Sequence, residues 1–462
     1  MSVVQTNSID AATASHCPDP PTGLDMLELR AHRLAVGDVT IAVIGLGYVG
    51  APLAHVALEA GCRVIAVDLD EARLEALIAG RSYIEGMSFE PFQAAALDGR
   101  LSVARDSKAM ADVDAVVICV PTPIDAAREP DLSHLTSALS NIAATFSRHC
   151  LVIIESTTWP GTTSELAAPI IESARGWRRG EEFLIVYSPE REDPGNRIWS
   201  TRAIPKILGA DDETSAHLAM CLYRRLFIKP ICVPSTRTAE AAKLLENTFR
   251  AVNIGLVNEL KVLFTGMGMD IWEVIEAAET KPFGFMPFYP GPGVGGHCIP
   301  VDPHYLSWKA RTLDLPARHI DVAAEVNVGM PFFVVARVAE ALDRTFGRGL
   351  RDARVLVLGV AYKPDVGDVR GSPALKIIEL LSERGSRVRY HDPFVAALDV
   401  GGQRLASTPL TAENAAEADL LLILTDHGAV DPAGAVDAIG LVVDTRNACA
   451  RRGLSPRTLF KA

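Results

Sequence analysis

A thiol inside a stiff loop is the feature of this sequence best suited to chemistry. Residues 289–303 include four glycines and four prolines, with Cys298 among them and Asp302 four residues further on. This composition excludes a helix interior or a central strand. It predicts either a nucleophilic thiol, with glycines that let a substrate carbon approach it, or a structural loop around a buried, inert cysteine.

A second candidate site is a glycine-rich turn near the start of the chain. An apolar run predicts a buried parallel strand that leads into Gly45-Leu-Gly47-Tyr-Val-Gly50, followed by a helix and by a second strand ending in Asp68. This order is typical of a dinucleotide-binding βαβ unit, in which an acid at the end of the second strand bonds the ribose hydroxyls. Because a carboxylate repels a 2′-phosphate, we predict NAD rather than NADP. The alternative is a chance βαβ turn.

Lys243 and Asn247 form a third candidate group. They lie four residues apart within 239–264, a segment whose apolar residues recur at helical spacing without a proline. On a helix they share one face. The pair is either functional or part of a solvated polar stripe.

The elements around these groups alternate between strand and helix. Three further apolar runs end in polar turns that contain Thr122, Thr157 and Glu190. Ligands of an open parallel sheet bind beyond the carboxyl ends of its strands, so we expect these turns to line one mouth. A second α/β unit begins near residue 355 without a GxGxxG motif. Lys363 and Arg370 flank the end of its first strand, where a diphosphate would need cations.

Composition narrows the class of protein. At 462 residues, 48% hydrophobic and 22% charged, the chain can form two or three globular domains. A net charge of -12 argues against nucleic acid as a partner. The eight cysteines show no CxxC pair, so we expect no disulfide framework and no metal site. Without a signal-like or membrane-spanning run, we expect a cytoplasmic protein with no membrane partner.

Six motifs occur in one order along the chain: Gly45-x-Gly47-Tyr-Val-Gly50, Pro121-Thr122-Pro123, Ser188-Pro-Glu190, Lys243-x-x-x-Asn247, Gly295-Gly-x-Cys298-x-Pro-x-Asp302 and Lys363. Over about residues 38–455 this order resembles the UDP-glucose/GDP-mannose dehydrogenase family of NAD-dependent four-electron oxidases. The resemblance implies an α/β fold of two Rossmann-like, doubly wound domains joined by a long central helix and a helical dimerisation region. The expected parts are a flexible N-terminal extension (1–37), an NAD-binding domain (38–235), a central helical region with the Cys loop (236–348) and a UDP-sugar-binding domain (349–462).

The resemblance also implies roles for single residues. Cys298 would be the nucleophile, Lys243 and Asn247 would stabilise the oxyanion, and Asp302 would position water and bases. Glu190 and Thr122 would assist proton transfer and hydrolysis, which completes the predicted catalytic set. The predicted cofactor contacts are Gly45, Gly47, Tyr48, Val49, Gly50, Asp68, Arg73, Thr122 and Thr157. The predicted substrate contacts are Glu190, Arg191, Lys243, Asn247, Gly295, Lys363 and Arg370. Two NAD per turnover and a homodimer or higher homo-oligomer are expected.

Two departures from the pattern of UDP-glucose members narrow the expected substrate. This chain reads His-Cys-Ile-Pro-Val-Asp-Pro at 297–303 in place of Ser-Cys-Phe-x-Lys-Asp, and Pro194 stands where a second glutamate is usual. With the sequence of 305–309, both variants resemble the branch that oxidises UDP-N-acetylhexosamines at C6 to the uronate through a Cys thiohemiacetal and thioester. The alternatives are UDP-glucose or GDP-mannose as substrate, or a non-catalytic protein that binds NAD and a nucleotide sugar.

Overall fold

The computed structural model describes residues 26–462 except 85, 126 and 193–199. The chain folds into two compact units. The first contains residues up to 121 together with 134–156 and 161–240. The second contains 122–133, 157–160 and 241–462. Two turns that the sequence placed in the 38–235 domain, those of Thr122 and Thr157, therefore pack with the second unit.

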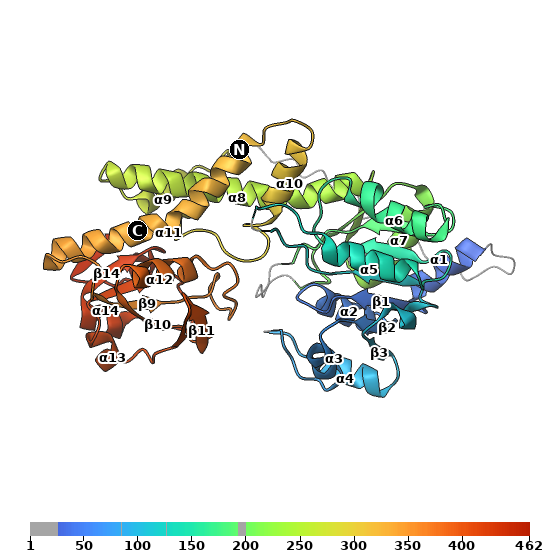
Figure 1. Ribbon diagram of the computed structural model, residues 1–462, viewed down its shortest axis with the longest axis horizontal. Coiled ribbons are helices and arrows are strands. Elements are labelled where there is room, and N and C mark those ends of the chain that lie inside the picture. Colours follow the sequence, from blue (N-terminus) through green and yellow to red (C-terminus); the bar gives the residue numbers. More distant parts are fainter. Residues whose placement is uncertain (1–25, 85, 126, 193–199) are drawn as a thin grey trace. The chain divides into compact units, whose positions relative to one another are not determined.

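The first unit is built on a sheet of eight described strands in the order β3-β2-β1-β4-β5-β6-β7-β8. Figure 1 labels β1, β2 and β3 of this sheet. All neighbours are parallel except β6 and β7, which are antiparallel. The strands are β1 Thr40–Ile44, β2 Arg63–Val67, β3 Leu101–Ala104, β4 Ala115–Ile118, β5 Leu151–Ile154, β6 Leu184–Tyr187, β7 Lys206–Ala210 and β8 Pro230–Val233. The helical segments are α1 Met26–Val36, α2 Gly50–Glu59, α3 Glu71–Ile78, α4 Glu90–Leu97, η1 Ser107–Met110, α5 Ser133–Ala143, η2 Thr163–Ala167, α6 Ala168–Arg175 and α7 Glu213–Leu226.

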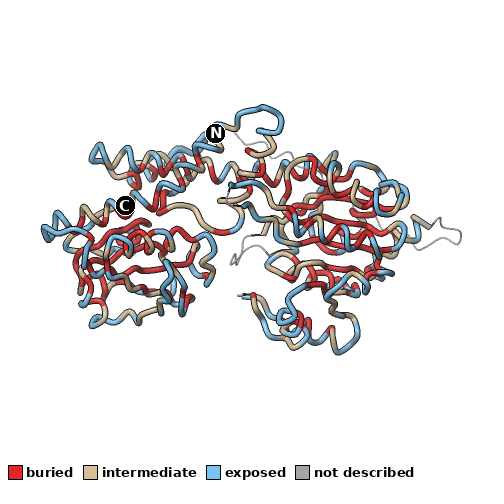
Figure 2. The backbone as a smooth tube through the Cα atoms, in the orientation of Figure 1, coloured by how far each residue is buried: buried red, intermediate tan, exposed pale blue. Residues whose placement is uncertain are grey.

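The strands at the centre of this sheet are buried on both faces. Every residue of β4, β5 and β6 is buried, which explains why these strands read as unbroken apolar runs in the sequence (Figure 2). Their parallel register brings Ile118, Ile154 and Tyr187 to one edge of the sheet. The polar turns that follow these strands begin at that edge.

Helix α1 corrects one prediction. The sequence placed residues 1–37 in a flexible extension, but 26–36 form a helix whose Leu34 is fully buried in the core of the first unit. Arg33 of α1 makes two hydrogen bonds to the Asp114 carboxylate, at 3.0 and 3.1 Å. The irregular apolar spacing hid this helix, because only a narrow stripe of it is buried. Residues 1–25 lie outside the described part of the chain.

The second unit contains a parallel sheet in the order β10-β9-β13-β14-β15 and a separate antiparallel pair, β11 and β12. The strands are β9 Arg354–Leu358, β10 Arg387–His391, β11 Ala397–Val400, β12 Gln403–Ala406, β13 Leu420–Ile423, β14 Leu441–Asp444 and β15 Thr458–Lys461. The helices are α8 Thr236–Gly266, α9 Ile271–Glu279, α10 Asp302–Arg311, α11 Arg318–Phe346, α12 Pro373–Glu383, α13 Ala412–Ala416, α14 Ala433–Ile439 and α15 Ala448–Arg451. The first five residues of α8 belong to the first unit.

Helix α8 is the long helix that the sequence predicted at 239–264, and α11 is a second long helix of the same unit. A buried hydrogen bond from Asn258 Nδ2 to Asn327 Oδ1, 2.9 Å long, joins them. Among the described residues, α11 alone is long and apolar enough to cross a membrane by length and composition. Core helices can pass the same test, and Val334, Val335 and Val338 of α11 are fully buried in the core around β9 and α12.

Candidate functional site

The glycine motif lies between β1 and α2. Gly45 has φ +87°, in the region that favours glycine, and its N–H donates to the Val67 carbonyl at 2.8 Å. A Cβ on Gly50 would lie 1.9 Å from the Gly45 carbonyl oxygen, so α2 can begin this close to β1 only with glycine there. A Cβ on Gly47 would have no atom of the described residues outside its chain neighbours within 4 Å. The turn therefore offers backbone and a helix N-terminus where a pyrophosphate can approach.

Asp68 follows β2 and lies beside this turn. Its carboxylate accepts hydrogen bonds from the N–H groups of Leu46 at 2.8 Å and Asp70 at 2.9 Å, and Arg73 Nη1 lies 3.5 Å from Oδ2. The Asp68 side chain is largely buried, with 9% of it exposed. Carboxylate oxygens can accept more than one hydrogen bond each, and ribose hydroxyls can donate them. The residues present fit a dinucleotide such as NAD.

A buried charge cluster stands at the end of β5 in the same unit. Lys206 Nζ lies 2.6 Å from Glu155 Oε2, and Tyr223 OH donates to Glu155 Oε1 at 2.6 Å. Burial, reinforced by the Glu155 charge, raises the pKa of Tyr223 well above its usual range. The sequence analysis missed this cluster because its members lie far apart in the chain. The available signal was Glu155, a charged residue directly after an apolar strand.

Glu190 and Arg191 follow β6. Arg191 Nη1 donates to the Pro205 carbonyl at 2.9 Å, and the Glu192 N–H donates to the Glu190 carboxylate. Burial, together with the Glu190 charge, raises the pKa of Glu192 to about 7. Two adjacent carboxyl groups, one of which binds a proton near neutral pH, are suited to proton transfer. Pro194, the position of the usual second glutamate, lies outside the described residues.

In the second unit, Lys243 and Asn247 lie on a buried face of α8. They are 5% and 7% exposed, so the solvated polar stripe is excluded. Asn247 Nδ2 donates to Asp302 Oδ2 at 2.5 Å. Asp302, 2% exposed, begins α10, and its own N–H donates to the Cys298 carbonyl at 2.8 Å. Asp302 therefore links the polar face of α8 to the turn that carries the thiol.

Cys298 differs in exposure from most of the other cysteines that the structure describes. It is partly exposed, whereas four other free cysteines are buried: Cys62, Cys119, Cys150 and Cys449. Burial raises the pKa of Cys150 to about 12, as expected of an inert thiol in an apolar core. Cys298 is therefore not a buried thiol, and its role as a nucleophile stays a prediction.

The glycines beside Cys298 serve close packing within the protein. A Cβ on Gly295 would lie 2.8 Å from the Gly371 carbonyl oxygen and 2.8 Å from Tyr362 Cβ. Gly296 has φ +90°, and a Cβ there would lie 3.0 Å from the Tyr362 ring. Residues of the chain itself therefore occupy the space beside Gly295 and Gly296, where the sequence predicted the approach of a substrate carbon. A substrate contact of Gly295 stays a prediction.

Thr122 and Thr157 lie in two turns that pack against α10. Tyr305 OH donates to the Thr122 carbonyl at 2.9 Å, and Tyr305 is fully buried. The ring centroids of Trp159, two residues after Thr157, and Trp308 are 4.6 Å apart. The helix that starts at Asp302 thus fixes two of the turns that the sequence predicted to line a binding mouth.

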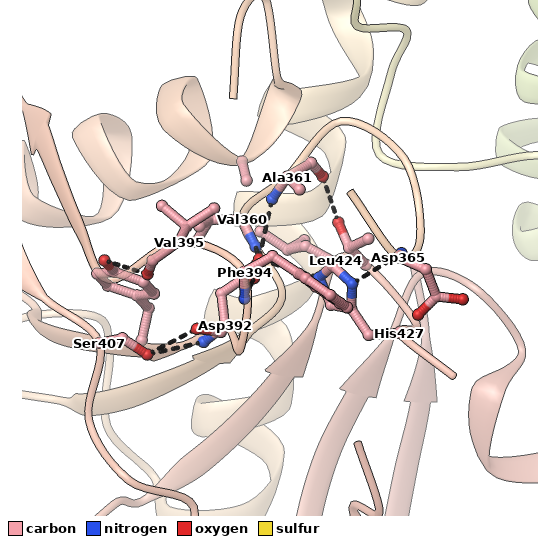
Figure 3. A network of polar contacts seen from close by, with 12 residues as sticks. Val360, Ala361, Asp365, Asp392, Phe394, Val395, Ser407, Leu424 and His427 are labelled. Atoms are coloured by element: carbon pink, nitrogen blue, oxygen red, sulfur yellow. Dashed lines mark hydrogen bonds and ion pairs between the residues drawn. The ribbon is translucent and has the colours of Figure 1, made fainter. Parts of the chain in front are cut away.

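The loop after β9, which carries Lys363, is anchored by a buried acid (Figure 3). Asp392 Oδ2 accepts hydrogen bonds from the N–H groups of Val360 at 2.8 Å and Ala361 at 3.2 Å. His427 Nε2 lies 2.9 Å from the same oxygen, with both side chains fully buried. His427 Nδ1 accepts a hydrogen bond from the Asp365 N–H at 3.0 Å. Nε2 therefore carries the ring proton and donates a hydrogen bond to Asp392.

Arg370, at the end of this loop, is held by Asp368. Its Nε and Nη2 donate to the two oxygens of the Asp368 carboxylate at 2.9 and 2.7 Å. The Arg370 guanidinium is thus partly neutralised, while 48% of its side chain stays exposed. Contacts of Lys363 and Arg370 with a diphosphate stay predictions.

Three family models match the chain in sequence order. They are the NAD binding domain, the central domain and the UDP binding domain of the UDP-glucose/GDP-mannose dehydrogenase family, at residues 39–227, 237–328 and 356–451. UDP-N-acetyl-D-glucosamine 6-dehydrogenase of Pseudomonas aeruginosa is 37% identical over 366 residues, 78% of this chain and 84% of that protein. UDP-N-acetyl-D-mannosamine dehydrogenase of Pyrococcus horikoshii is 36% identical over 388 residues, 84% of this chain and 89% of that protein.

A solved structure shares the fold over most of the chain. The structure of a UDP-D-ManNAc dehydrogenase from Pyrococcus horikoshii superposes with a TM-score of 0.80 at 34% identity, covering 88% of this chain and 96% of that one.

Proposed function

Because the chain belongs to the UDP-glucose/GDP-mannose dehydrogenase family and is an NAD-dependent nucleotide-sugar dehydrogenase, we propose that it acts at C6 of a sugar nucleotide. The proposed reaction oxidises the C6 hydroxyl of a UDP-N-acetylhexosamine to the carboxylate. The names of the two relatives support an N-acetylated gluco- or manno-configured sugar. The His-Cys-Ile-Pro-Val-Asp-Pro segment supports the same substrate class.

One observation carries the catalytic part of the proposal. The Asn247–Asp302–Cys298 linkage joins a buried polar helix face to a partly exposed thiol. Lys243 lies on the same helix face, one turn before Asn247, and is 5% exposed. A protein that only bound its ligands would not need an accessible thiol in such a setting. The non-catalytic alternative is therefore disfavoured.

The chemistry assigned to these residues proceeds in three steps. The C6 alcohol loses a hydride and a proton to become an aldehyde. The Cys298 thiolate attacks this aldehyde to form a thiohemiacetal, which loses a second hydride and a proton and becomes a thioester. Water then cleaves the thioester, which releases the carboxylic acid and regenerates the thiol. Lys243 and Asn247 donate to the oxyanion in the covalent steps, and a preorganised donor contributes about 3–4 kcal/mol to such a transition state.

Proton transfer in this proposal falls to the residues that the family resemblance assigns to it. Glu190 takes up protons during oxidation and hydrolysis, with Glu192, whose pKa is about 7, as its neighbour. Thr122 assists, and Asp302 orients the attacking water through its carboxylate. Gly45, Gly47, Gly50 and Asp68 hold the cofactor. When bound, NAD accepts the hydride that leaves C6, so the four-electron reaction consumes two NAD.

We further propose that the protein acts in the cytoplasm as a homodimer or a higher homo-oligomer. The support is an apolar stripe on α8 and the residue just after it, whose members are 45–67% exposed: Leu245, Phe249, Leu256, Leu263 and Met267. Their spacing of four and seven residues keeps them on one helix face, which a symmetric contact between two copies would bury.

A substrate panel tests the proposal. The protein is incubated with NAD and, separately, UDP-N-acetylglucosamine, UDP-N-acetylmannosamine, UDP-glucose and GDP-mannose, and the products are identified by mass spectrometry. We expect a uronate, 14 Da heavier than the sugar, from an N-acetylated substrate at the highest kcat/KM. A preference for UDP-glucose or GDP-mannose would establish the alternative substrate. Uronate formation by Cys298→Ala at the normal rate would contradict the covalent mechanism.

A further inference from the structure

The loop that follows β9 holds the thiol loop by several contacts inside the second unit. We name residues 361–371 the clamp loop. The Gly296 N–H donates to the Arg370 carbonyl at 3.1 Å, and the Tyr362 ring fills the space beside Gly296. His297, the residue before Cys298, places Nε2 at 3.6 Å from Asp368 Oδ2. Both residues that directly precede the thiol are therefore bound by the clamp loop.

Asp368 is the central residue of these contacts. Its carboxylate holds His297 and the Arg370 guanidinium, and its carbonyl accepts the Tyr362 N–H at 3.0 Å. The side chain is 15% exposed, and this burial opposes ionisation. Hydrogen bonds from His297 and Arg370 outweigh it and keep the pKa of Asp368 well below its usual range. The carboxylate is therefore charged wherever the enzyme can be assayed.

The clamp loop is also fixed at its other end. The Asp365 N–H donates to His427 Nδ1 at 3.0 Å, and the Gly428 N–H donates to Asp365 Oδ1 at 2.8 Å. Since His427 is itself paired with Asp392 in the core, the loop has a rigid base (Figure 3). A loop fixed in this way can hold another segment in place, as Asp368 does with His297.

We propose that Asp368 is a positioning residue for Cys298, acting through His297 to fix the thiol at the carbon it attacks. The inference rests on the proposed function, since it assigns Asp368 to the thiol-dependent half of that reaction. The first oxidation, alcohol to aldehyde, does not use the thiol. The second requires attack by the Cys298 sulfur, because only the resulting thiohemiacetal yields a thioester. Loss of Asp368 should therefore slow the second oxidation and leave the first nearly unchanged.

The test measures NADH formation in a single turnover, with enzyme in excess over the sugar nucleotide that the substrate panel identifies. Asp368→Asn keeps the shape of the side chain and removes its charge. His297→Gln removes the imidazole and leaves the Asp368–Arg370 pair intact, so it tests the proposal independently should Asp368→Asn fold poorly. Asp399→Asn is the matched control, because Asp399 pairs with Arg404 at 3.9 Å on the exposed hairpin of the same unit. Thermal unfolding and calorimetric UDP binding report on the fold of each variant.

We expect the second NADH to form at least tenfold more slowly in Asp368→Asn and His297→Gln, with the first NADH within threefold of the unsubstituted enzyme. In steady state, kcat for acid formation should fall by a similar factor with KM for the nucleotide sugar within threefold, and Asp399→Asn should behave as the unsubstituted protein. Equal slowing of both phases, or of neither, would overturn the role of Asp368. A Cys298→Ala variant that still forms the second NADH would overturn the proposed function instead.

Discussion

The turns after β1 and β9 share one backbone hydrogen-bond pattern, and each contains a carboxylate that accepts from the turn. The two carboxylates differ in their exposure and in their other partners. In both, a glycine N–H donates to the carbonyl at the end of the second strand: Gly45 to Val67 at 2.8 Å, and Gly359 to His391 at 2.9 Å. In both, the acid that follows this strand accepts the next N–H of the turn at 2.8 Å. That acid is Asp68 in the first unit and Asp392 in the second.

The partners of the two acids separate their functions. The Asp68 side chain is 9% exposed, against 0% for that of Asp392, and it lies near the half-exposed Arg73, so its carboxylate has room for the ribose hydroxyls of the proposed cofactor. The oxygens of Asp392 are taken by three backbone N–H groups and by the fully buried His427. An acid closed off in this way stabilises the turn and leaves ligand recognition to side chains further along the loop. In the proposed function, the same local fold is thus a binding element in one unit and a structural base in the other.

We expect the largest effect when each of the two acids is neutralised in turn. Asp392→Asn leaves at least one buried donor without an acceptor and His427 without its charged partner. We expect a loss of about 3 kcal/mol in the free energy of unfolding. Asp68→Asn leaves one backbone donor of the turn without its carboxylate acceptor but breaks no buried pair with a histidine, so it should cost less, about 1–2 kcal/mol. Urea unfolding of the two variants measures both values, and equal losses would show that the two carboxylates have the same role.

The strands that could be predicted from the sequence are those in which every residue is buried by neighbouring elements. β4, β5, β13 and β14 are buried at every residue and read as apolar runs. β8, at the edge of its sheet, has exposed residues at its centre and begins with a proline, so no pattern marked it. Local patterns carry no information about pairing across a fold.

The same distinction holds for the candidate site. Lys243 and Asn247 could be paired from the sequence because they lie one helical turn apart. The contacts of Glu155 with Lys206, and of His297 with Asp368, join residues 51 and 71 positions apart, which only the tertiary structure brings together. The glycines around Cys298 were recognised as sites of close approach, but what approaches them, Tyr362 and the clamp loop, could not be read from their own segment.

Cofactor binding provides the next largest effect. Asp68→Ala removes a charged acceptor for the ribose hydroxyls, and such hydrogen bonds contribute about 1.5–3 kcal/mol, so NAD should bind roughly ten- to hundredfold more weakly. UDP binding should not change. Calorimetric titration with NAD and with UDP measures both. The unsubstituted protein should prefer NAD to NADP, and equal kcat/KM for the two would contradict the role given to Asp68.

Nucleotide binding in the second unit should depend on Lys363 and not on Asp392. Lys363→Ala removes one cation from the predicted diphosphate site, and we expect UDP to bind about tenfold more weakly, a change of about 1.4 kcal/mol, with NAD binding unaltered. Calorimetry on the folded variant reports both affinities. Loss of NAD affinity with retained UDP affinity would reverse the ligand assignment of the two units.

The smallest effect that we expect concerns the pH dependence of stability. One carboxyl group of each unit, Asp419 and Glu192, should change the stability with pH in opposite directions. In the second unit, burial of Asp419 is outweighed by hydrogen bonds from Arg354 and Arg348, which lower its pKa to about 2. Its stabilising contribution is therefore complete above the unfolded-state pKa of about 3.9 and is lost as the pH falls through about 2. In the first unit, the folded state holds a proton on Glu192 up to about pH 7, whereas an unfolded glutamate releases it near 4.3.

The sign for Glu192 is thus reversed: stability rises as the pH falls from 7 towards 4.3, because the folded state binds the proton first. Glu192→Gln mimics the protonated form, so its melting temperature should exceed that of the unsubstituted protein at pH 7.5 and equal it near pH 4.5. Asp419→Asn should melt lower at pH 7.5, and its deficit should shrink only below pH 4. Thermal denaturation of the three proteins across this range measures the two differences. A Glu192→Gln difference that is constant with pH would show that the pKa of Glu192 is the same in the folded and unfolded states, and would remove Glu192 as a proton-transfer neighbour of Glu190.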